Sequence, residues 1–238
     1  MKMLSTKYCQ DNEFEIGIDE AGRGPLFGRL YVAAVLLPKD PSAFEIPDIK
    51  DSKKIKNKKK LRQLSDFIKE NAESWSIQYI EHDEIDAINI RQAVLKAMHL
   101  CVADILKKQT INPIINKTFL LIDGNDFKPY CIYDNIRETL YTVPYTTVER
   151  GDNTYSAIAA ASILAKCARD SYIEDLCERF PALCEFYNLN SNMGYGTKAH
   201  LEGIETHGIT PWHRITYSRC KGKPVNSSFA NSHLELVL

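Results

Sequence analysis

The stretch Glu15-Ile16-Gly17-Ile18-Asp19-Glu20-Ala21-Gly22-Arg23-Gly24-Pro25 decides the fold. Its residues 15–18 alternate towards apolar side chains and predict a strand that ends at two acids, Asp19 and Glu20. A turn rich in glycine follows, and residues 30–37 then form a nearly continuous apolar run, which is typical of a central, buried strand. The two strands and the turn between them predict a β-hairpin.

Three more strands are predicted further along the chain, at residues 76–81, 117–122 and 145–149. The second of these stops at Asp123, and the third stops just before Gly151 and Asp152. Acidic residues therefore stand at or just beyond the ends of three predicted strands.

Helical patterns follow the strands. Asp83 is a candidate N-cap for a long amphipathic helix whose apolar positions run from 90 to 105. Asn153 or Thr154 can cap an alanine-rich helix, which Pro181 ends. Strands that lead and helices that cover them predict an α/β layered domain.

The chain after about residue 180 is predicted to be a helical appendage of that domain. Thr197 is a candidate cap for a short helix, and Gly208 is placed to terminate it. After Pro211 the sequence predicts irregular structure, and the last dozen residues are expected to be loosely held.

The length of the chain and its apolar runs limit the class of protein to which it can belong. A chain of 238 residues has room for one large domain or for one domain and an appendage. The longest apolar run, residues 30–37, is too short to span a membrane, and residues 1–15 contain no apolar signal core. We therefore expect a cytoplasmic protein with no membrane partner, and a monomer.

The cysteines and the charges exclude few classes of protein. Seven cysteines are an odd number without a CxxC pair, which disfavours both a zinc site and a disulfide framework and favours reduced thiols. A net charge of −1 gives no sign of nucleic-acid binding. Residues 50–60 form a lysine-rich run, which is either a solvated face or a contact surface for phosphates.

The acids Asp19, Glu20, Asp123 and Asp152 are candidate metal ligands, because open α/β sheets place ligands at the carboxyl ends of strands. Two carboxylates about 4 Å apart repel each other by roughly 4 kcal/mol at an effective dielectric constant near 20. A converging set would therefore need protons or cations, and oxygen ligands favour Mg²⁺ or Mn²⁺ over zinc. The alternative is four unrelated acids that cap helices or close turns.

The stretch from Gly17 to Pro25 resembles the signature of the ribonuclease HII family, and the resemblance extends over about residues 14–218. Further segments agree with the family in the same order. They are Asp51-Ser52-Lys53-Lys54, Glu84-Ile85-Asp86-Ala87-Ile88-Asn89-Ile90, Ile122-Asp123-Gly124-Asn125, Gly151-Asp152 with the helix to Arg169-Asp170, Gly194-Tyr195-Gly196-Thr197 with His200, and His213-Arg214.

The resemblance implies a ribonuclease H-like α/β fold, a mixed five-stranded sheet flanked by helices with a C-terminal helical appendage. It implies an endonuclease that hydrolyses the phosphodiester on the 5′ side of a ribonucleotide, in RNA–DNA hybrids or in duplex DNA, and leaves a 3′-hydroxyl and a 5′-phosphate. The ions would be two Mg²⁺ or Mn²⁺, and the biological role would be ribonucleotide removal in DNA repair and replication. The implied catalytic residues and metal ligands are Asp19, Glu20, Asp123 and Asp152.

Substrate contacts are implied in the same way. The backbone and side chain of Gly22, Arg23 and Gly24 would recognise the ribose 2′-hydroxyl, and Tyr195 would stack on the next sugar. Glycine permits a close backbone approach, and a 2′-hydroxyl is both donor and acceptor. The lysines Lys53 and Lys54 are expected to contact phosphates.

The expected domain organisation is an N-terminal extension at residues 1–13, a catalytic domain at 14–218 and a flexible tail at 219–238. Leucines in the segment His233-Leu234-Glu235-Leu236-Val237-Leu238 are spaced loosely like a peptide that docks on a sliding clamp, although a frayed end has the same pattern.

The chain departs from the family pattern at a few positions. Met193 stands where a lysine is usual, Ile215-Thr216-Tyr217-Ser218 replaces the usual ending, and there is an insert near 130–143. None of these touches an acid, so they concern substrate affinity rather than chemistry. Ribonuclease HIII shares the acids, but it has a lysine where Arg23 stands and a large N-terminal domain that this sequence lacks.

Two other classes of function are considered. A nucleic-acid-binding module of the same fold without catalysis is disfavoured because all four acids are present. A nucleotide-binding α/β enzyme is disfavoured because neither G-x-x-x-x-G-K-[ST] nor G-x-G-x-x-G follows a predicted strand.

Overall fold

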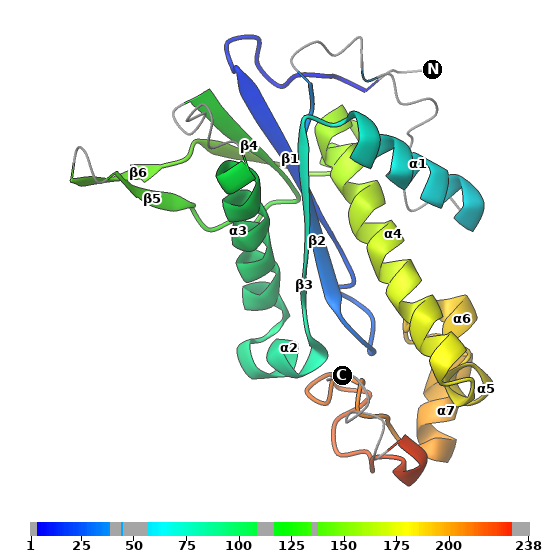
Figure 1. Ribbon diagram of the computed structural model, residues 1–238. Helices are drawn as coiled ribbons and strands as arrows, with labels where there is room; N and C mark the ends of the chain where they lie inside the picture. The colour runs from blue at the N-terminus through cyan, green and yellow to red at the C-terminus, as the bar shows by residue number, and fades with distance from the viewer. Residues whose placement is uncertain (1–3, 39–43, 45–56, 109–116, 135–137, 230–238) are drawn as a thin grey trace. The chain divides into compact units, whose positions relative to one another are not determined.

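The computed structural model describes residues 4–38, 44, 57–108, 117–134 and 138–229 (Figure 1). The chain divides into two compact units, and each has a hydrophobic core of its own. The sheet unit comprises Met1–Ala21, Tyr31–Tyr79 and Val94–Ala168. The helical unit comprises Gly22–Leu30, Ile80–Ala93 and Arg169–Leu238.

Five strands form the main sheet: β1 (Phe14–Ala21), β2 (Leu30–Leu36), β3 (Ser74–Ile80), β4 (Thr118–Asp123) and β7 (Tyr145–Val148). Their order is β3-β2-β1-β4-β7. β1 pairs antiparallel with β2 and parallel with β4, and β4 pairs parallel with β7. The sheet is therefore mixed, and the expected ribonuclease H-like arrangement is confirmed.

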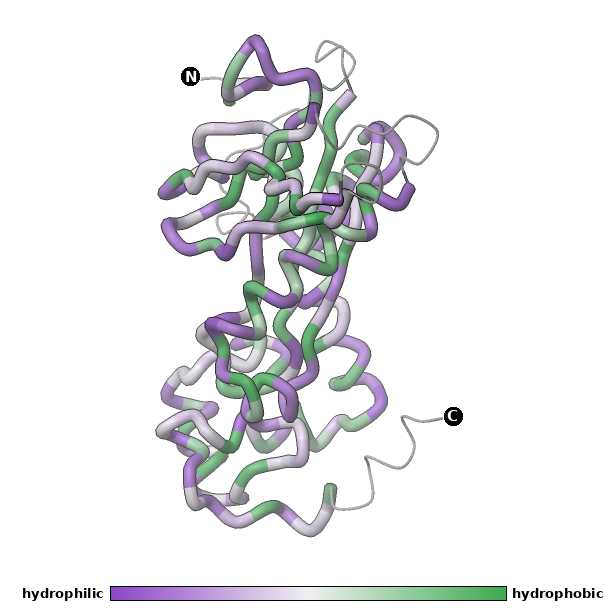
Figure 2. The backbone as a smooth tube through the Cα atoms, turned by 90° about the vertical axis from the view of Figure 1, so that its left-hand side faces the viewer, coloured by the Kyte–Doolittle hydropathy of each residue, from purple (hydrophilic) through white to green (hydrophobic). Residues whose placement is uncertain are grey.

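The prediction of a central, buried strand at residues 30–37 is confirmed by β2. Every residue of β2 is buried, and most of its tube is hydrophobic in the colouring of Figure 2. A strand inside a sheet with helices on both faces has no solvated side, so its apolar run need not alternate with polar residues.

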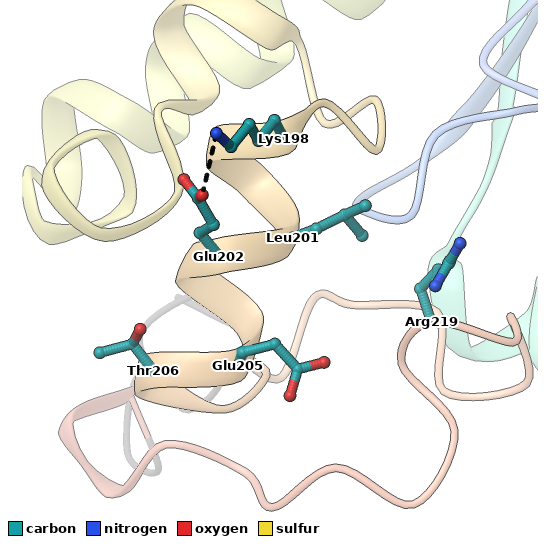
Figure 3. Close-up of a pocket in the computed structure, with 6 residues that line it drawn as sticks. All are labelled: Lys198, Leu201, Glu202, Glu205, Thr206 and Arg219. Atoms are coloured by element: carbon teal, nitrogen blue, oxygen red, sulfur yellow. Dashed lines mark ion pairs between the residues drawn. The ribbon is translucent and has the colours of Figure 1, made fainter.

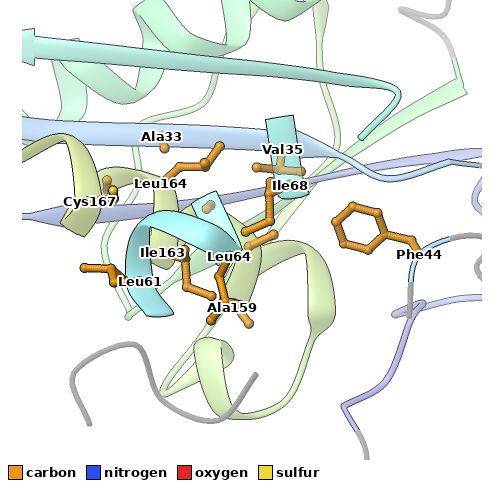
Figure 4. Close-up of a cluster of buried hydrophobic side chains, with 13 residues drawn as sticks. Ala33, Val35, Phe44, Leu61, Leu64, Ile68, Ala159, Ile163, Leu164 and Cys167 are labelled. Atoms are coloured by element: carbon orange, nitrogen blue, oxygen red, sulfur yellow. The ribbon is translucent and has the colours of Figure 1, made fainter. Parts of the chain in front are cut away.

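Helices cover both faces of the sheet unit. α1 (Lys58–Asn71) and the first half of α4 (Ser156–Arg179) lie on one side, and α3 (Ile90–Lys108) lies on the other (Figure 1). On the first side, Ala33 and Val35 of β2 pack against apolar residues of α1 and α4 (Figure 4). On the other side, the Cys101 thiol of α3 lies 3.4 Å from the carbonyl oxygen of Val32.

Helix α4 approaches the sheet closely at Gly17 in β1. A Cβ at this position would lie 2.2 Å from the backbone carbon of Ala157 in α4. A side chain at residue 17 would therefore push α4 away from the sheet at the level of the acids that follow it.

The long helix expected after residue 83 is two helices, and its predicted cap is wrong. α2 (His82–Ile88) begins one residue earlier, with Glu81 as an N-cap that makes no side-chain capping bond. The chain then breaks at Asn89, whose φ of 67° is left-handed, and the Asn89 Oδ1 accepts the N–H of Gln92 at the start of α3. This φ ends α2, and the Asn89 side chain then serves as the cap that starts α3.

The predicted caps of the alanine-rich helix are also wrong. Residues Gly151–Asn153 form a short 3₁₀ helix, η4, and α4 starts only at Ser156. Arg150, with a left-handed φ of 56°, begins this turn. The predicted end of α4 before Pro181 is confirmed.

The helical unit contains α2, the second half of α4, and the short helices α5 (Ala182–Tyr187), α6 (Leu189–Asn192), α7 (Lys198–His207) and η5 (Ser227–Phe229). Both predicted ends of α7 are confirmed, because the Thr197 side chain accepts the N–H of His200 and Gly208 is the C-cap. Trp212 and Phe27 are among the fully buried side chains of this unit.

Several described elements have no counterpart in the predictions. Residues of the insert form a two-stranded sheet from β5 (Cys131–Asp134) and β6 (Thr139–Thr142), and the lysine-rich run continues into α1. All seven cysteines are free thiols. In the described part of the chain, no helix combines the length and apolar character needed to cross a membrane.

Candidate active site

The carboxyl ends of β1 and β4 bring two predicted acids together. The parallel register pairs Ile18 with Ile122, so Asp19 and Asp123 stand one residue further along neighbouring strands. Residues at the same level of paired strands point to the same face of a sheet. Accordingly, the charge of Asp123 acts on the carboxyl of Asp19 and raises its pKa.

The turn after β7 contacts Asp123 through Gly151, the residue that precedes the predicted acid Asp152. The N–H of Gly151 donates to Asp123 Oδ1 over 2.7 Å. A Cβ at residue 151 would lie 2.5 Å from Ile158 Cδ1 and 3.3 Å from Asp123 Oδ1, so a side chain there would have to displace one of these groups. Asp152 follows in η4, where its side chain is buried and its Oδ1 accepts from Asn153 Nδ2 over 2.8 Å.

Asp19 is the most unusual of these acids because it is fully buried. Its Oδ1 accepts the N–H of Glu20 over 2.7 Å, whereas its Oδ2 is buried without a hydrogen-bond partner. Burial raises the pKa of Asp19 well above its ordinary value, and the charges of Glu20 and Asp123 raise it further. The nearby Ser162 hydroxyl of α4 and the Glu20 N–H act in the opposite direction.

The Glu20 carboxyl is near enough to Asp19 for its charge to raise the Asp19 pKa more than that of Asp123 does, although its Cβ points to the other face of the sheet. Glu20 follows Asp19 inside β1, and successive Cβ atoms of a strand point to opposite faces. Within the described ranges, no three acidic, histidine or cysteine side chains are arranged so that they could hold a metal ion as they stand. Coordination by three of the predicted ligands would therefore require a change of side-chain rotamer.

The buried oxygen of Asp19 is the observation that bears on a metal. A buried carboxyl oxygen without a donor, beside like charges, is costly unless a proton or a cation compensates it. Carboxylate oxygens are the ligands that Mg²⁺ and Mn²⁺ prefer. The residues at this sheet edge thus fit a divalent cation in chemistry, with Asp19 as the central ligand.

In the helical unit, the predicted recognition turn Gly22-Arg23-Gly24 is built around a buried arginine. The fully buried Arg214 donates from Nε to the carbonyl of Gly28 over 3.0 Å, and from Nη1 to the carbonyls of Pro25 and Arg23 over 2.9 and 3.2 Å. The Tyr217 hydroxyl also donates to the Arg23 carbonyl, over 2.8 Å. Four bonds to three carbonyls, those of Arg23, Pro25 and Gly28, fix the backbone of this turn and of the residues that follow it.

A second buried arginine explains why residue 22 is glycine. Gly22 has a φ of 106°, and a Cβ there would lie 2.5 Å from Nε of Arg169. Arg169 donates from Nη2 to the carbonyl of Phe27 over 3.3 Å. Burial and the charge of Arg214 lower the pKa of Arg169 to about 10, so both guanidinium groups are cationic at neutral pH and favour a phosphate-bearing ligand.

Tyr195 lies beside the same turn. Its side chain is 50% exposed, and a Cβ at Gly24 would lie 3.6 Å from its ring. The guanidinium of Arg169 lies 5.8 Å from the ring centroid. The structure thus brings Gly22, Arg23, Gly24 and Tyr195 together in the helical unit, as the resemblance implies.

Some predicted site residues lie outside the described residues, namely Lys53, Lys54 and the segment His233-Leu234-Glu235-Leu236-Val237-Leu238. Conversely, the structure shows roles that the sequence analysis does not assign. Arg169 and Arg214 stand in segments that match the family, but only burial reveals that they support the turn. Ser162 gives no signal of its own within an alanine-rich helix.

A pocket of about 570 Å³ lies along α7 (Figure 3). Its lining includes the ion pair of Lys198 with Glu202, at 3.7 Å, and Arg219. None of the site residues predicted from the sequence lines this pocket, so it plays no part in the candidate site.

Comparison with known proteins decides the family. The family model described as "Ribonuclease HII" matches residues 16–220. The chain belongs to the ribonuclease HII family. It is 41% identical to the ribonuclease HII of Parabacteroides distasonis over 211 residues, which cover 89% of this chain and 93% of the relative. Members of this family are endoribonucleases of the ribonuclease H type, so the chain is an enzyme of that class.

Solved structures agree on the fold of the ribonuclease HII family. The ribonuclease H2 of Pyrococcus horikoshii OT3 has a TM-score of 0.65 at 22% identity, and the match covers 87% of this chain and 95% of that one. A PCNA:RNase HII complex from Archaeoglobus fulgidus gives 0.60 at 22% identity, with 86% and 95% covered. Bst-RNase HIII in complex with Mn²⁺ gives 0.60 at 16% identity, with 96% and 71% covered.

Proposed function

We propose that this enzyme hydrolyses the phosphodiester on the 5′ side of a ribonucleotide in RNA–DNA hybrids and in duplex DNA. The products are a 3′-hydroxyl and a 5′-phosphate, and the nucleophile is a water. The biological role that follows is the removal of ribonucleotides from DNA during replication and repair.

The proposal rests above all on Asp19, whose buried Oδ2 lacks a donor and whose neighbours Glu20 and Asp123 are acids. In the proposed active form, Asp19, Glu20, Asp123 and Asp152 hold two divalent ions, Mg²⁺ or Mn²⁺. A Mn²⁺ complex of a related ribonuclease HIII supports the choice of metal. When bound, such ions supply a water of lowered pKa and neutralise the attacking and leaving oxygens.

The residues of the chain have separate tasks in this proposal. Asp19, as the most buried carboxyl, keeps bulk water away from the ions and fixes their position against β1. Asp123 is oriented by the N–H of Gly151, which leaves its second oxygen for a ligand. Asp152 completes the set from η4.

Substrate recognition is proposed for the turn in the helical unit. The exposed Arg23 and Gly24 and the backbone of Gly22 bind the 2′-hydroxyl and the adjacent phosphate, while the Tyr195 ring packs on the following sugar. Arg214 and Arg169 do not reach the substrate in this proposal. They hold the carbonyls of the turn inward, which leaves its N–H groups for the ligand.

The decisive experiment for the proposal is cleavage of duplex DNA that contains one ribonucleotide, with product ends mapped at single-nucleotide resolution. We expect one cut on the 5′ side with Mg²⁺ or Mn²⁺ and none with EDTA. A 2′,3′-cyclic phosphate product, or cleavage that persists in EDTA, would show that the ribose hydroxyl rather than a metal-activated water is the nucleophile.

Lys53 and Lys54 are proposed to contact phosphates of the substrate. Loss of one such contact weakens binding to all duplexes alike and lowers the slope of log K against log salt by about 0.9. We therefore expect Lys53→Ala to raise the dissociation constant and flatten its salt dependence while the cut site stays the same. A changed cut site would contradict a phosphate contact.

The C-terminal segment is proposed to bind a sliding clamp, which the related PCNA:RNase HII complex supports. The segment contains three leucines and a valine, side chains of the kind that an apolar groove on a clamp binds. Deletion of residues 230–238 should abolish retention on immobilised cognate clamp and leave cleavage of short duplexes unchanged. Equal retention of the full and shortened chains would dispose of this partner.

A further inference from the structure

The backbone around Tyr195 is held in place by bonds within the helical unit. Its N–H donates to the carbonyl of Asn192 over 3.0 Å, and its carbonyl accepts the N–H of Thr197 over 2.7 Å. The same carbonyl lies 3.0 Å from Nδ1 of the fully buried His200. The exposed ring of Tyr195 is therefore carried by a backbone whose carbonyl is anchored from the interior.

His200 in turn contacts a second buried histidine, His213. His200 Nε2 lies 3.0 Å from His213 Nε2, and the N–H of Thr210 donates to His213 Nδ1 over 2.9 Å. The Thr210 hydroxyl is also 2.8 Å from that nitrogen. The connected groups thus form a path from the Thr210 backbone through two imidazoles to the Tyr195 carbonyl.

Only one placement of protons satisfies this path. A backbone N–H can only donate, so His213 Nδ1 must carry a lone pair, and an imidazole with one lone pair there carries its proton on Nε2. His213 Nε2–H then donates to His200 Nε2, which must be unprotonated. The proton of His200 is consequently on Nδ1, where it donates to the Tyr195 carbonyl.

The hydrogen bonds along this path cannot all form if either imidazole gains a second proton. A proton on His213 Nδ1 would face the Thr210 N–H, and a proton on His200 Nε2 would face the His213 N–H. Burial lowers the pKa of both histidines, and the charges of His200 and His82 lower that of His213 further. Among the described residues, the titratable Tyr187 of α5 also packs against the pair, with its ring centroid 6.0 Å from His200 and 5.2 Å from His213.

We propose that His200 and His213 form a positioning pair, which holds Tyr195 against the sugar of the substrate while both imidazoles are neutral. The pair acts through Tyr195 and does not touch the substrate, and this role rests on the proposed function of Tyr195. Selectivity for a single ribonucleotide therefore depends on these two histidines, which are buried beneath the recognition surface.

The tautomers give a test that needs no substrate. In ¹⁵N-resolved NMR spectra of the full chain at pH 7, we expect His213 to be protonated only at Nε2 and His200 only at Nδ1. The reverse tautomers, or a charged imidazole at either position, would overturn the proposal, even if the enzyme cuts its substrate as expected.

The second test measures selectivity, as the ratio of kcat/KM on a single-ribonucleotide duplex to kcat/KM on a continuous hybrid. His200→Leu should lower this ratio by about two- to tenfold, the factor that one hydrogen bond is worth. His200→Asn, whose amide can still donate to the Tyr195 carbonyl, should lower it less. His207→Asn, at the C-terminal end of the same helix, where the half-buried ring stacks on Phe186, is the matched control and should leave the ratio unchanged.

A double substitution separates this role from general support of the fold. In a Tyr195→Ala background, His200→Leu should not change the ratio further, because the ring that His200 positions is gone.

In the wild type, the ratio of the two kcat/KM values should also fall in acid as the imidazoles gain protons. An unchanged ratio in His200→Leu, or an additional loss in the Tyr195→Ala background, would overturn the proposal. Failure of the wild type to cut either substrate would instead refute the proposed function and leave the tautomer result standing.

Discussion

Replacement of Asp19 by Asn is expected to abolish cleavage while the protein stays folded and becomes more stable without metal. The substitution removes a metal ligand at nearly constant volume. Metal ions stabilise the transition-state charge by several kcal/mol, and each 1.36 kcal/mol is tenfold, so turnover should fall by about a thousandfold or more. Stability should rise because the carboxylate is buried with an unpartnered oxygen and acidic neighbours.

The pH dependence of stability follows from the same carboxyl. The pKa of Asp19 is raised in the folded state, so the folded metal-free chain holds more protons than the unfolded chain above pH 3.8. Stability therefore decreases as pH rises from that value through the raised folded pKa. The Asp19→Asn variant should lack this decrease, and Mg²⁺ should offset it in the wild type by binding the folded state.

The loss of cleavage and the change in stability can both be measured on Asp19→Asn and one control variant. Thermal unfolding between pH 4 and 8, with and without Mg²⁺, gives the stability, and single-turnover cleavage gives the activity. Asp175→Asn is the matched control, because Asp175 is an exposed acid of α4 that pairs only loosely with Arg179, at 3.6 Å. Retained turnover in Asp19→Asn would show that the acids are misassigned as metal ligands.

The fold was predictable where one residue pattern has one structural solution. An apolar run of the length of β2 is typical of a strand inside a sheet, and the glycine-rich turn before it favours the antiparallel pair with β1. The helix starts were less predictable. Asp83 and Asn153 have suitable side chains for a cap, but a left-handed Asn89 and a 3₁₀ turn at Gly151–Asn153 place the actual starts elsewhere.

The candidate site likewise has parts that the sequence predicts and parts that it does not. The acids stand at strand ends in the sequence, and parallel register alone suffices to bring Asp19 and Asp123 to one level. Whether all four acids bind metal depends on rotamers, which no sequence pattern determines. The supporting roles of Arg169, Arg214 and the two histidines depend on burial and on partners distant in sequence, so the motifs identify these residues but not what they do.

The predicted domain boundaries, with a catalytic domain at 14–218 and a tail at 219–238, remain a proposal. The two compact units follow a different division, since the turn at Gly22–Leu30 and the segment Ile80–Ala93 join the C-terminal helices. In this division the acids and the recognition turn belong to different units, although Glu20 and Gly22 are only two residues apart in the chain. Limited proteolysis that releases a stable 14–218 fragment would support the boundaries.

The presence of a single 2′-hydroxyl should decide whether a duplex is cut at all. A site that is built to hydrogen-bond a hydroxyl leaves its own polar groups unpaired when the hydroxyl is missing, at about 1–3 kcal/mol in binding. In catalysis, such sites reject the analogue that lacks the group by roughly 10⁴–10⁵-fold. Gly24 is exposed beside the Tyr195 ring, where its backbone can approach this hydroxyl, and Gly22 leaves room for the buried Arg169 that supports the turn.

We therefore expect no cleavage of an all-DNA duplex, one cut in the matched duplex with one ribonucleotide, and several cuts in the continuous hybrid. Tyr195→Ala should lose most activity on the single-ribonucleotide duplex, where only one register places a deoxyribose under the ring, and less on the hybrid. Tyr133→Ala, which removes an exposed tyrosine of β5, is the control and should behave as wild type on all three substrates. Efficient cutting of the all-DNA duplex would refute the functional assignment. Equal losses of Tyr195→Ala on both ribose-containing substrates would refute only the role of Tyr195, because a ring that contacts the next sugar must matter most where a single register is available.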